Sequence, residues 1–324
     1  MHSAPISIAA IVIGRNEGDR LVQCLTSLRG FDRIVYVDSG STDGSVEMAQ
    51  GRGVEVVALD MRQKFTAARA RNAGIAQLSG SNPPEFVQFL DGDCELQGGW
   101  LDQAKAHLIA HPDIAVVCGR RRERFPDASL YNAQCDREWD TPIGQARACG
   151  GDALMRFDAV QQVGGYNPGL IAGEEPEMCV RLRAKGWKIW RIDVEMALHD
   201  AAMTRFSQYW KRARRSGHAF AEGAFLHGSP PEKHFVSETK RSALWGLGIP
   251  ALIVFLSLIS PWALMLIWVY PAQILRMARR DGFTKLGWQT AILLTLAKFA
   301  EGQGVLEFHL RRLLNRPAGL IEYK

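Results

Sequence analysis

Short apolar runs alternate with stretches of helical spacing along the first 120 residues. Residues 6–13, ISIAAIVI, are apolar except for one serine, and four similar runs follow, at 33–37, 54–59, 86–90 and 114–119. A strand that is covered on both faces has a continuous apolar run, whereas a half-exposed strand alternates apolar and polar residues. The pattern therefore predicts strands that are buried on both faces of a sheet.

The segments between these runs carry apolar residues at the spacing of one helical face. In the first segment four such residues share a face: Leu21, Cys24, Leu25 and Leu28. Helical patterns also occur in three later segments, near residues 45–51, 65–78 and 99–110. Strands that alternate with helices form βαβ units, so we expect an α/β fold with a mostly parallel, Rossmann-like sheet.

The alternation loosens between residues 120 and 200, where glycine pairs interrupt the chain. A helix is expected to begin near Glu174 and to end at Gly186. Acidic residues occupy its first turn and basic residues stand near its end, as the helix dipole favours. Residues 187–192, WKIWRI, predict one more strand.

Residues 243–275 contain no charged residue in 33 positions. Because about 20 apolar residues cross a bilayer, this stretch predicts membrane sequence rather than a buried core helix. Ser260 and Pro261 divide it, so one long tilted helix and a hairpin of two short helices are both compatible with it. A second, shorter apolar stretch, 286–297, is expected to be either a span or an interfacial helix. Basic residues flank both ends of the long stretch and leave the topology open: Arg241, Arg276, Arg279 and Arg280.

Residues 205–215, RFSQYWKRARR, combine five basic residues with no acid. Four residues of this segment share helical spacing: Phe206, Tyr209, Trp210 and Ala213. We expect a helix that lies along an anionic membrane surface with its aromatic side at the acyl boundary. An ordinary basic face in water is the alternative.

The composition narrows the picture only in part. A chain of 324 residues has material for one large domain with an appendage or for two domains. The net charge of +5 indicates an anionic partner, which on charge alone is a nucleic acid, a membrane surface or a phosphorylated small molecule. The six cysteines lack the two-residue spacing of zinc or redox sites, so free thiols in a reducing compartment are expected.

Two carboxylates follow the apolar run at 86–90 directly, in the triplet Asp91-Gly92-Asp93. In open parallel sheets, ligands bind outside the carboxyl ends of the strands, where such a triplet would lie. Neighbouring carboxylates repel each other unless a positive group joins them, and a divalent cation prefers such oxygen ligands. An ordinary turn is the alternative for this triplet taken alone.

Asp38 also stands at the end of a predicted strand, within YVDSGSTDGS at 36–45. Capping of the following helix accounts for Ser41 and Asp43. It does not account for Asp38, whose carboxylate is suited to accept hydrogen bonds from a base or a ribose.

These residues belong to five motifs whose order resembles that of family 2 glycosyltransferases, which have the GT-A fold. The motifs are VIGRNEG (12–18), VDSGSTDGS (37–45), RARNAG (69–74), FLDGDCEL (89–96) and GGYNPGLIAGEEPEMCVRLRAKGWKI (164–189). The resemblance covers roughly residues 6–220. It implies a nucleoside-diphosphate sugar as donor, and a nucleotide site formed by Arg15, Glu17, Asp38, Arg71, Asp91 and Gly92.

The resemblance also implies a bound divalent cation, Mn²⁺ or Mg²⁺. Asp93 takes the place of the acid that ligates this metal, and Asp91 takes that of the first acid of the family's Asp-x-Asp motif, which contacts the ribose. His199 resembles a histidine that some members add as a further metal or diphosphate contact, with a structural role as the alternative. Arg205 is expected to hold the diphosphate, although membrane contact is an equally good use for it.

Glu175 takes the place of the catalytic base, with Glu174 beside it. The chain departs here from the family, which usually carries Glu-Asp at this helix start. Because glutamate is one methylene longer than aspartate, the departure leaves open which of the two carboxylates is the base. The reaction that the resemblance implies is an inverting transfer of a sugar to an acceptor hydroxyl.

We therefore expect a catalytic domain over residues 1–222, with a nucleotide-sugar half at about 1–120 and an acceptor half at about 121–222. A membrane-associated helical region is expected over 223–324. The apolar tail favours a lipid-linked or saccharide acceptor in cell-surface polysaccharide or glycolipid assembly. The expected location is the cytoplasmic (inner) membrane with the catalytic domain facing the cytoplasm, and no nucleic-acid partner is expected.

Three other classes of protein compete with this interpretation. A dehydrogenase is disfavoured because the only G-x-G-x-x-A match, Gly246–Ala251, lies in the apolar stretch and contains Pro250. A sugar-nucleotidyltransferase, which makes nucleotide sugars, acts on soluble substrates and would have no use for the apolar tail. An inactive membrane scaffold with the same fold is the third alternative.

Overall fold

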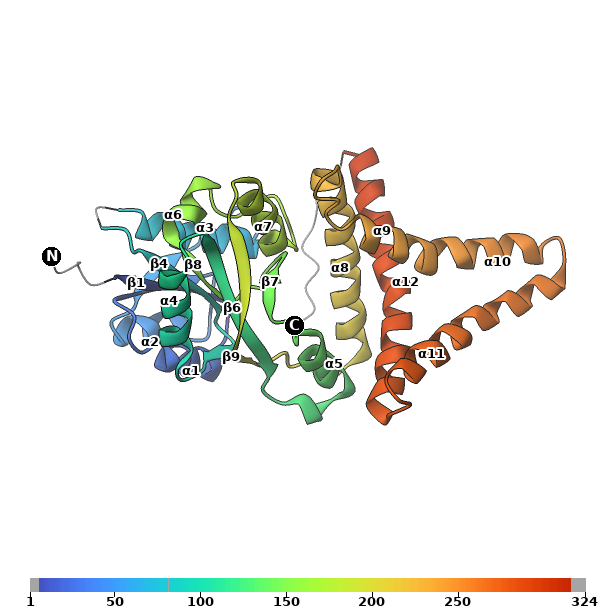
Figure 1. Cartoon of the computed structure of the whole chain (residues 1–324), viewed down its shortest axis with the longest axis horizontal. Helices are drawn as coiled ribbons and strands as arrows, with labels where there is room; N and C mark the ends of the chain where they lie inside the picture. Colours follow the sequence, from blue (N-terminus) through green and yellow to red (C-terminus); the bar gives the residue numbers. More distant parts are fainter. Residues whose placement is uncertain (1–5, 81, 316–324) are drawn as a thin grey trace. The chain divides into compact units, whose positions relative to one another are not determined.

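A computed structural model describes residues 6–80 and 82–315, and the chain divides into two compact units (Figure 1). The α/β unit contains Met1–Pro126 and Cys135–Ala201, and the helical unit contains Asp127–Gln134 and Ala202–Lys324. Residue 222, the expected end of the catalytic domain, lies inside helix α8 (Phe206–His227) of the helical unit.

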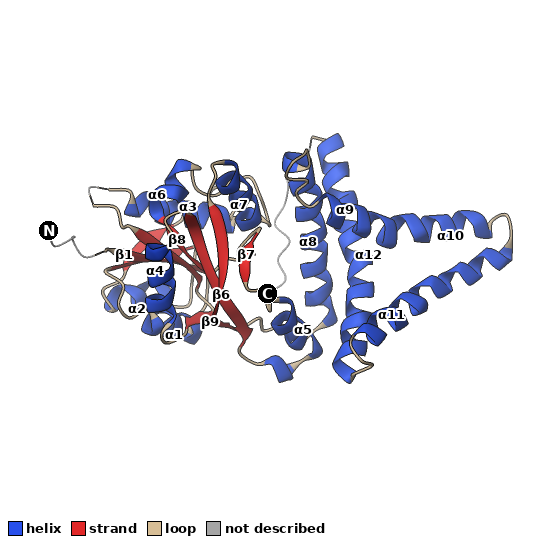
Figure 2. Cartoon of the chain, viewed as in Figure 1, coloured by secondary structure: helices blue, strands red, loops and turns tan. Residues whose placement is uncertain are grey.

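A nine-stranded mixed sheet forms the centre of the α/β unit (Figure 2). Its main order is β3-β2-β1-β4-β8-β6-β9-β5, and β7 pairs with β9. β1 runs parallel to β2 and β4, and β2 runs parallel to β3, whereas β8 runs antiparallel to both β4 and β6. The strands are β1 (Ile8–Gly14), β2 (Arg33–Asp38), β3 (Glu55–Ala58), β4 (Phe86–Asp91), β5 (Cys94–Leu96), β6 (Ile114–Glu123), β7 (Gly144–Ala146), β8 (Ala153–Arg156) and β9 (Lys188–His199).

The predicted strands and helices of the first 120 residues are confirmed. β1, β2 and β4 are almost completely buried, in agreement with their continuous apolar runs. Helix α3 packs on β1 and β2, while α4 packs on β6 and β9. The helices of this unit are α1 (Asp19–Ser27), α2 (Ser45–Gly51), α3 (Ala67–Leu78), α4 (Trp100–Ala110), α6 (Phe157–Gln162) and α7 (Glu174–Ala184), and α5 (Leu130–Glu138) is divided between the two units.

The helical unit is built on two long helices, α8 and α12 (Lys285–Leu313), that pack closely together. Glycines permit this approach, because a Cβ at Gly217 would overlap the carbonyl oxygen of Glu301, and a Cβ at Gly304 would overlap that of Arg214. Arg214 and Glu307 form an ion pair between the two helices at 2.7 Å. Small residues at the crossing therefore set the distance between the helices.

Two expectations for this unit are corrected. Tyr209 and Ala213 are buried, and the Tyr209 hydroxyl donates to the carbonyl oxygen of Leu293 at 3.0 Å, so this side of α8 packs on protein and not on acyl chains. The stretch 286–297 lies within α12, where Ala291, Leu293 and Ala297 are buried. Its apolar pattern therefore reflects in part the packing of α12 against α8, and α12 is not among the candidate spans of the described residues, whereas its interfacial role stays a prediction.

The apolar stretch forms a hairpin, which confirms one of the two arrangements that the sequence allowed (Figure 1). The first arm continues from α9 (Val236–Ala243) through a π-helical turn (Leu244–Gly248) into α10 (Ile249–Ser257). The second arm is a 3₁₀ segment (Pro261–Trp268) followed by α11 (Val269–Arg280). Within the described residues, one helix, Val236–Ser257, has the length and apolar character that a membrane crossing needs.

Candidate active site

The ends of β1 and β4 meet at the carboxyl edge of the parallel strands. Gly92 follows β4, and its amide donates to the carbonyl oxygen of Ile13 at 2.8 Å. A Cβ at Gly92 would lie 3.2 Å from that oxygen and 3.2 Å from Cγ of Glu17. The triplet needs glycine because its turn presses against the end of β1, and Asp91 and Asp93 flank this contact.

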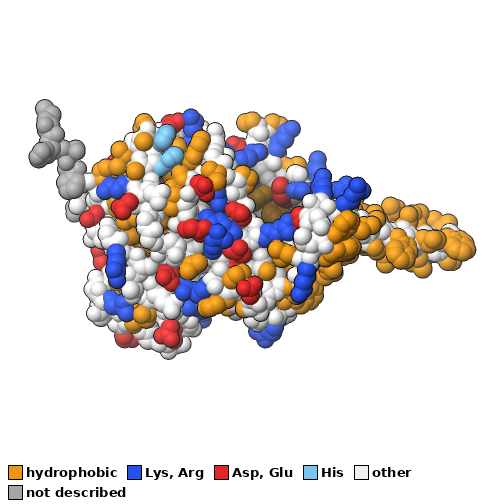
Figure 3. Space-filling view, turned by 60° about the horizontal axis from the view of Figure 1, so that its bottom comes forward, with side chains coloured by type: hydrophobic (Ala, Val, Ile, Leu, Met, Phe, Trp, Pro, Cys, Tyr) orange, Lys and Arg blue, Asp and Glu red, His pale blue; other side chains and the backbone are white. Residues whose placement is uncertain are grey.

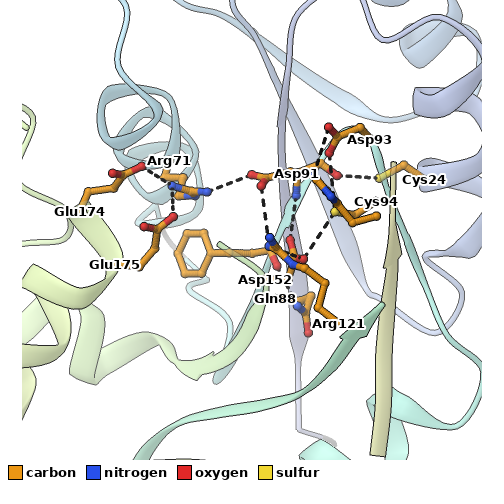
Figure 4. A network of polar contacts seen from close by, with 12 residues as sticks. Cys24, Arg71, Gln88, Asp91, Asp93, Cys94, Arg121, Asp152, Glu174 and Glu175 are labelled. Atoms are coloured by element: carbon orange, nitrogen blue, oxygen red, sulfur yellow. Dashed lines mark hydrogen bonds and ion pairs between the residues drawn. The ribbon is translucent and has the colours of Figure 1, made fainter. Parts of the chain in front are cut away.

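Arg71 on α3 lies among three carboxylates (Figure 4). Its guanidinium contacts Asp91 Oδ1 at 2.9 Å, Glu174 Oε1 at 3.1 Å and Glu175 Oε1 at 2.8 Å, and its side chain is only 3% exposed. The ring of Tyr166 lies 5.4 Å from the guanidinium carbon. A buried arginine presents several fixed donors, so it holds acids from three segments in one cluster.

Glu175 is the more exposed of the paired glutamates, with 14% of its side chain exposed against 5% for Glu174. Burial and, second to it, the nearby Glu174 charge raise the pKa of Glu175 to about 7, while Arg71 acts in the opposite direction. A carboxylate with a pKa near neutrality is suited to accept a proton. The geometry therefore favours Glu175 over Glu174 as the group that reaches a substrate.

Asp93 and His199 form a second pair at this edge. His199 ends β9, and its Nε2 atom lies 3.4 Å from Asp93 Oδ2. The Nδ1 atom of His199 is buried and makes no hydrogen bond within the described part of the chain. Asp93, Cys94 and His199 bring their donor atoms within 4.8 Å of one another. A carboxylate beside an imidazole with an unsatisfied buried nitrogen fits a cation such as Mn²⁺.

Asp152 is a member of the site that sequence reasoning missed. Its carboxylate is buried, accepts from the amide of Asp91 at 3.2 Å and pairs with Arg121 at 2.6 Å. Burial raises the pKa of Asp152, although Arg121 acts in the opposite direction. Because β8 runs antiparallel to β4, the residue that precedes β8 meets the end of β4. The sequence signal that could have identified Asp152 is an acid that directly precedes a buried apolar strand instead of following one.

Gly151, which was also missed, leaves the space that the carboxylate cluster fills. A Cβ there would lie 2.6 Å from a guanidinium nitrogen of Arg71, 3.0 Å from Asp91 Oδ2 and 3.3 Å from Glu175 Oε1. The neighbouring Gly150 has room, since the nearest atom to its Cβ position is 3.9 Å away. Of the glycine pair in the sequence, the second alone is required by the packing.

Asn72 holds the segment that carries Tyr166. Its side-chain amide donates to the carbonyl oxygen of Tyr166 at 2.7 Å and accepts from the Tyr166 amide at 2.8 Å. The contact joins positions that are 94 residues apart in the chain. It therefore fixes the backbone beside Arg71.

The predicted nucleotide residues are distributed around this cluster. Asp38 is buried at the end of β2, where it accepts from the Tyr36 hydroxyl and from the amides of Gly40 and Ser41, each at 2.9 Å. Through these hydrogen bonds the carboxylate stabilises the loop that follows β2. Glu17 pairs with Arg20 at 2.7 Å, and Arg15 is exposed.

The catalytic, metal and diphosphate candidates, together with Arg71, fall into three groups. Asp91, Arg71, Glu174 and Glu175 come together through direct contacts, and Asp93 lies beside His199. Arg205 belongs to the helical unit, where it precedes α8 and its amide donates to the Gln208 side chain at 3.0 Å. The contacts of the α/β unit thus unite most of the catalytic and metal candidates on one edge of the sheet.

Comparison with known proteins is consistent with this geometry. Residues 9–164 match the glycosyl transferase family 2 model. The chain is 25% identical over 209 residues to the pre-mycofactocin glycosyltransferase of Mycobacterium tuberculosis and 27% identical over 208 residues to the succinoglycan biosynthesis protein ExoA of Rhizobium meliloti. Each alignment covers 60% of this chain, but only 42% and 61% of those two relatives.

The fold is also similar to that of a solved mannosyltransferase. This structure, from Pyrobaculum calidifontis with GDP-mannose and Mn²⁺, has a TM-score of 0.63 at 19% identity and covers 94% of this chain and 90% of its own. At this identity the similarity establishes the fold, and it confirms the predicted GT-A architecture.

Proposed function

We propose that this chain, which carries a glycosyl transferase family 2 domain, moves a sugar from a nucleoside-diphosphate sugar to an acceptor hydroxyl. The observation that carries the proposal is the buried Arg71 cluster, which joins the end of β4 to the start of α7. This arrangement brings a candidate base close to the candidate metal and nucleotide residues. Inversion at the anomeric carbon is the expected outcome of a single direct displacement.

Glu175 is the proposed catalytic base. Its pKa near 7 lets it be ionised in a large fraction of molecules at neutral pH and still bind a proton readily. Arg71 contacts it at 2.8 Å and so fixes the carboxylate's position. Glu174, which is more deeply buried on the same guanidinium, is proposed to hold Arg71 rather than to touch the acceptor.

Asp93, Asp91 and His199 are the proposed holders of the divalent cation, Mn²⁺ or Mg²⁺. A cation bound there would neutralise charge on the diphosphate leaving group. Arg121 pairs with Asp152 and lies 3.9 Å from Asp91 Oδ2, so Asp91 already has a positive neighbour on this side. We propose Asp93 and His199 as the main ligands for this reason.

The nucleotide is proposed to bind beside the loops that follow β1, β2 and β4. Arg15, Glu17, Asp38, Arg71, Asp91 and Gly92 are the residues assigned to it. The loop of Asn16 and the loop of Ser41 and Thr42 are joined by two hydrogen bonds, of 2.9 and 2.8 Å. This connection supports one continuous wall for a base and ribose.

The acceptor is proposed to be lipid-linked or a saccharide, in cell-surface polysaccharide or glycolipid assembly. The exposed apolar hairpin supports a membrane location, and the similarity to a succinoglycan biosynthesis protein supports the polysaccharide assignment. We propose the cytoplasmic (inner) membrane, with the catalytic unit on the cytoplasmic side. The catalytic activity is proposed to reside in the α/β unit, and the membrane association in the helical unit.

Transfer from a panel of radiolabelled nucleotide sugars, with the full chain in membranes, tests the proposal. We expect label to move into an extractable product from one donor, to stop with EDTA, and to return when Mn²⁺ is added. Formation of a nucleotide sugar from a sugar phosphate and a nucleoside triphosphate would instead identify a nucleotidyltransferase. Absence of donor binding and transfer across the whole panel would favour an inactive scaffold.

A further inference from the structure

The tip of the hairpin exposes its largest apolar side chains. Leu258 is 82% exposed, Ile259 73% and Trp262 80%. Soluble proteins rarely present a continuous apolar surface of this kind to water. Figure 3 shows the outer part of the hairpin as almost entirely hydrophobic, with basic side chains near its base.

The backbone amides of the turn at the tip find their hydrogen-bond partners within the protein. The amides of Leu258, Ile259 and Ser260 donate to carbonyl oxygens of α10, at 2.9 to 3.2 Å, and Pro261 has no amide hydrogen. Within hydrocarbon, backbone polar groups must find partners inside the protein. The turn is therefore compatible with a lipid interior, whereas most loops are not.

The base of the hairpin has the opposite character. Trp245 on the first arm and Tyr270 on the second pack together, and the Tyr270 hydroxyl donates to the Trp245 carbonyl oxygen at 2.8 Å. Exposed basic residues lie at the base of the hairpin, before Trp245 in the first arm and after Tyr270 in the second: Lys240, Arg241, Arg276, Arg279 and Arg280. Aromatic residues favour the membrane interface, and basic residues favour anionic headgroups.

The composition of the tip favours dipping over two crossings, and the length of the arms allows it. Residues 244–260 give a first arm of about 25 Å at the helical rise, and the second arm, 261–275, has a similar length. The hydrocarbon core of a bilayer is about 30 Å thick, so an arm of this length that starts in the headgroup region reaches the interior of the bilayer without needing to cross it. Two crossings would also place the apolar tip among the headgroups of the far leaflet, where it has no polar or charged residue except Ser260.

We propose that residues 244–275 form a re-entrant hairpin that enters one leaflet of an anionic bilayer, turns at Ser260-Pro261 within the hydrocarbon, and leaves on the side it entered. The hairpin's tip lies near the bilayer centre, and its basic base binds lipid phosphates. Both chain ends of the hairpin stay on one side of the membrane. The inference rests on the membrane association proposed above but is independent of the proposed reaction.

Cysteine labelling of the full chain in sealed vesicles tests the topology. The vesicles contain phosphatidylcholine and phosphatidylglycerol at about 3:1, and the reagent is a maleimide that cannot cross the bilayer. The six native cysteines are buried, so the unchanged chain sets the background. Ser260→Cys reports on the tip, and Lys285→Cys, at the exposed start of α12, is the matched control on the base side.

We expect Ser260→Cys to react at less than about a tenth of the extent of Lys285→Cys, before and after the vesicles are made permeable. Reaction of Ser260→Cys on the side opposite to Lys285→Cys would show a full crossing and overturn the proposal. Equal reaction of both from the same side would show that the hairpin is not inserted. Neither labelling measurement depends on sugar transfer, so this test stays valid even where the chain proves not to catalyse the proposed reaction.

Vesicle flotation of charge variants supplies a second test. Leu258→Arg should lower the bound-to-free ratio roughly 100-fold, because an arginine near the bilayer centre is strongly disfavoured. Leu313→Arg, at another highly exposed leucine outside the hairpin, should leave binding unchanged. Equal binding of both variants and the unchanged chain would overturn insertion of the tip.

Discussion

The α/β unit buries charged side chains of a kind that is usually exposed, whereas the hairpin of the helical unit exposes apolar side chains of a kind that is usually buried. In the α/β unit, Arg71, Asp152 and Glu174 are buried inside a sheet-based core. In the hairpin, Leu258 and Trp262 are almost fully exposed. Exposed single apolar residues are normal, but buried charge clusters and broad apolar surfaces indicate a function.

The contrast teaches that each unit is shaped for a different partner. Buried carboxylates are costly unless cations or donors offset their repulsion, which fits a site for a metal and a diphosphate. Exposed leucine and tryptophan are costly in water but favourable in lipid. Changes at the α/β site should therefore affect transfer without changing membrane binding, whereas changes in the hairpin should affect membrane binding and, through it, transfer to a membrane-bound acceptor.

Asp93→Asn should produce the largest effect on transfer. Loss of one carboxylate charge beside His199 weakens binding of the cation, whose contribution to the transition state is several kcal/mol, so kcat/KM should fall by about 1000-fold or more. Initial rates at several Mn²⁺ concentrations measure this change. Asp102→Asn, at an exposed acid on α4, is the control, and near-normal metal-dependent activity of Asp93→Asn would remove the metal assignment.

Glu175→Gln should lower kcat by about 100-fold or more while it changes donor affinity little, because an amide cannot accept the acceptor's proton. Glu174→Gln is the matched variant, since it removes the same charge from the same guanidinium. Its effect on kcat should be smaller. If Glu174→Gln proves the more damaging of the two in steady-state kinetics, the assignment of the base is reversed.

The pH profile of transfer should report Glu175 directly. With a pKa of about 7 in the free enzyme, the carboxylate is ionised above that pH, so kcat/KM should rise through pH 7 and fall about tenfold for each unit below it. Because the folded state holds this proton more tightly than the unfolded chain, the same group lowers stability as pH rises from 4.5 to about 7. A kcat/KM that is flat from pH 5.5 to 8 would contradict the assignment.

Gly151→Ala should have a smaller but diagnostic effect. Its Cβ would lie 2.6 Å from Arg71, so the cluster must shift, at a cost of about 1–3 kcal/mol in the free energy of unfolding and a several-fold loss of kcat. Gly150→Ala has room for its Cβ and should behave as the unchanged chain. Chemical denaturation and initial rates compare the two. Equal effects of both variants would show that packing against Arg71 is not what requires Gly151.

The sequence predicted the parallel half of the sheet well, because its strands are fully covered and leave continuous apolar runs. Asp38 and Asp91 were located at strand ends for the same reason. Asp152 was missed because its place depends on the antiparallel pairing of β8 with β4, which no local pattern encodes. Tyr209 was misread because an aromatic stripe has the same periodicity whether it packs on lipid or on another helix.

The side chain of Asn72 replaces a missing strand neighbour, since it satisfies both backbone groups of Tyr166. The residue before it in α3 is Arg71, whose guanidinium lies over the Tyr166 ring. Two consecutive residues of α3 therefore supply the buried charge and the hydrogen bonds that position the ring beside it. Asn72→Asp would keep the size of the side chain but replace a donor with a second acceptor that faces the Tyr166 carbonyl oxygen. The Tyr166 ring would then lose a hydrogen bond that positions it beside the Arg71 guanidinium.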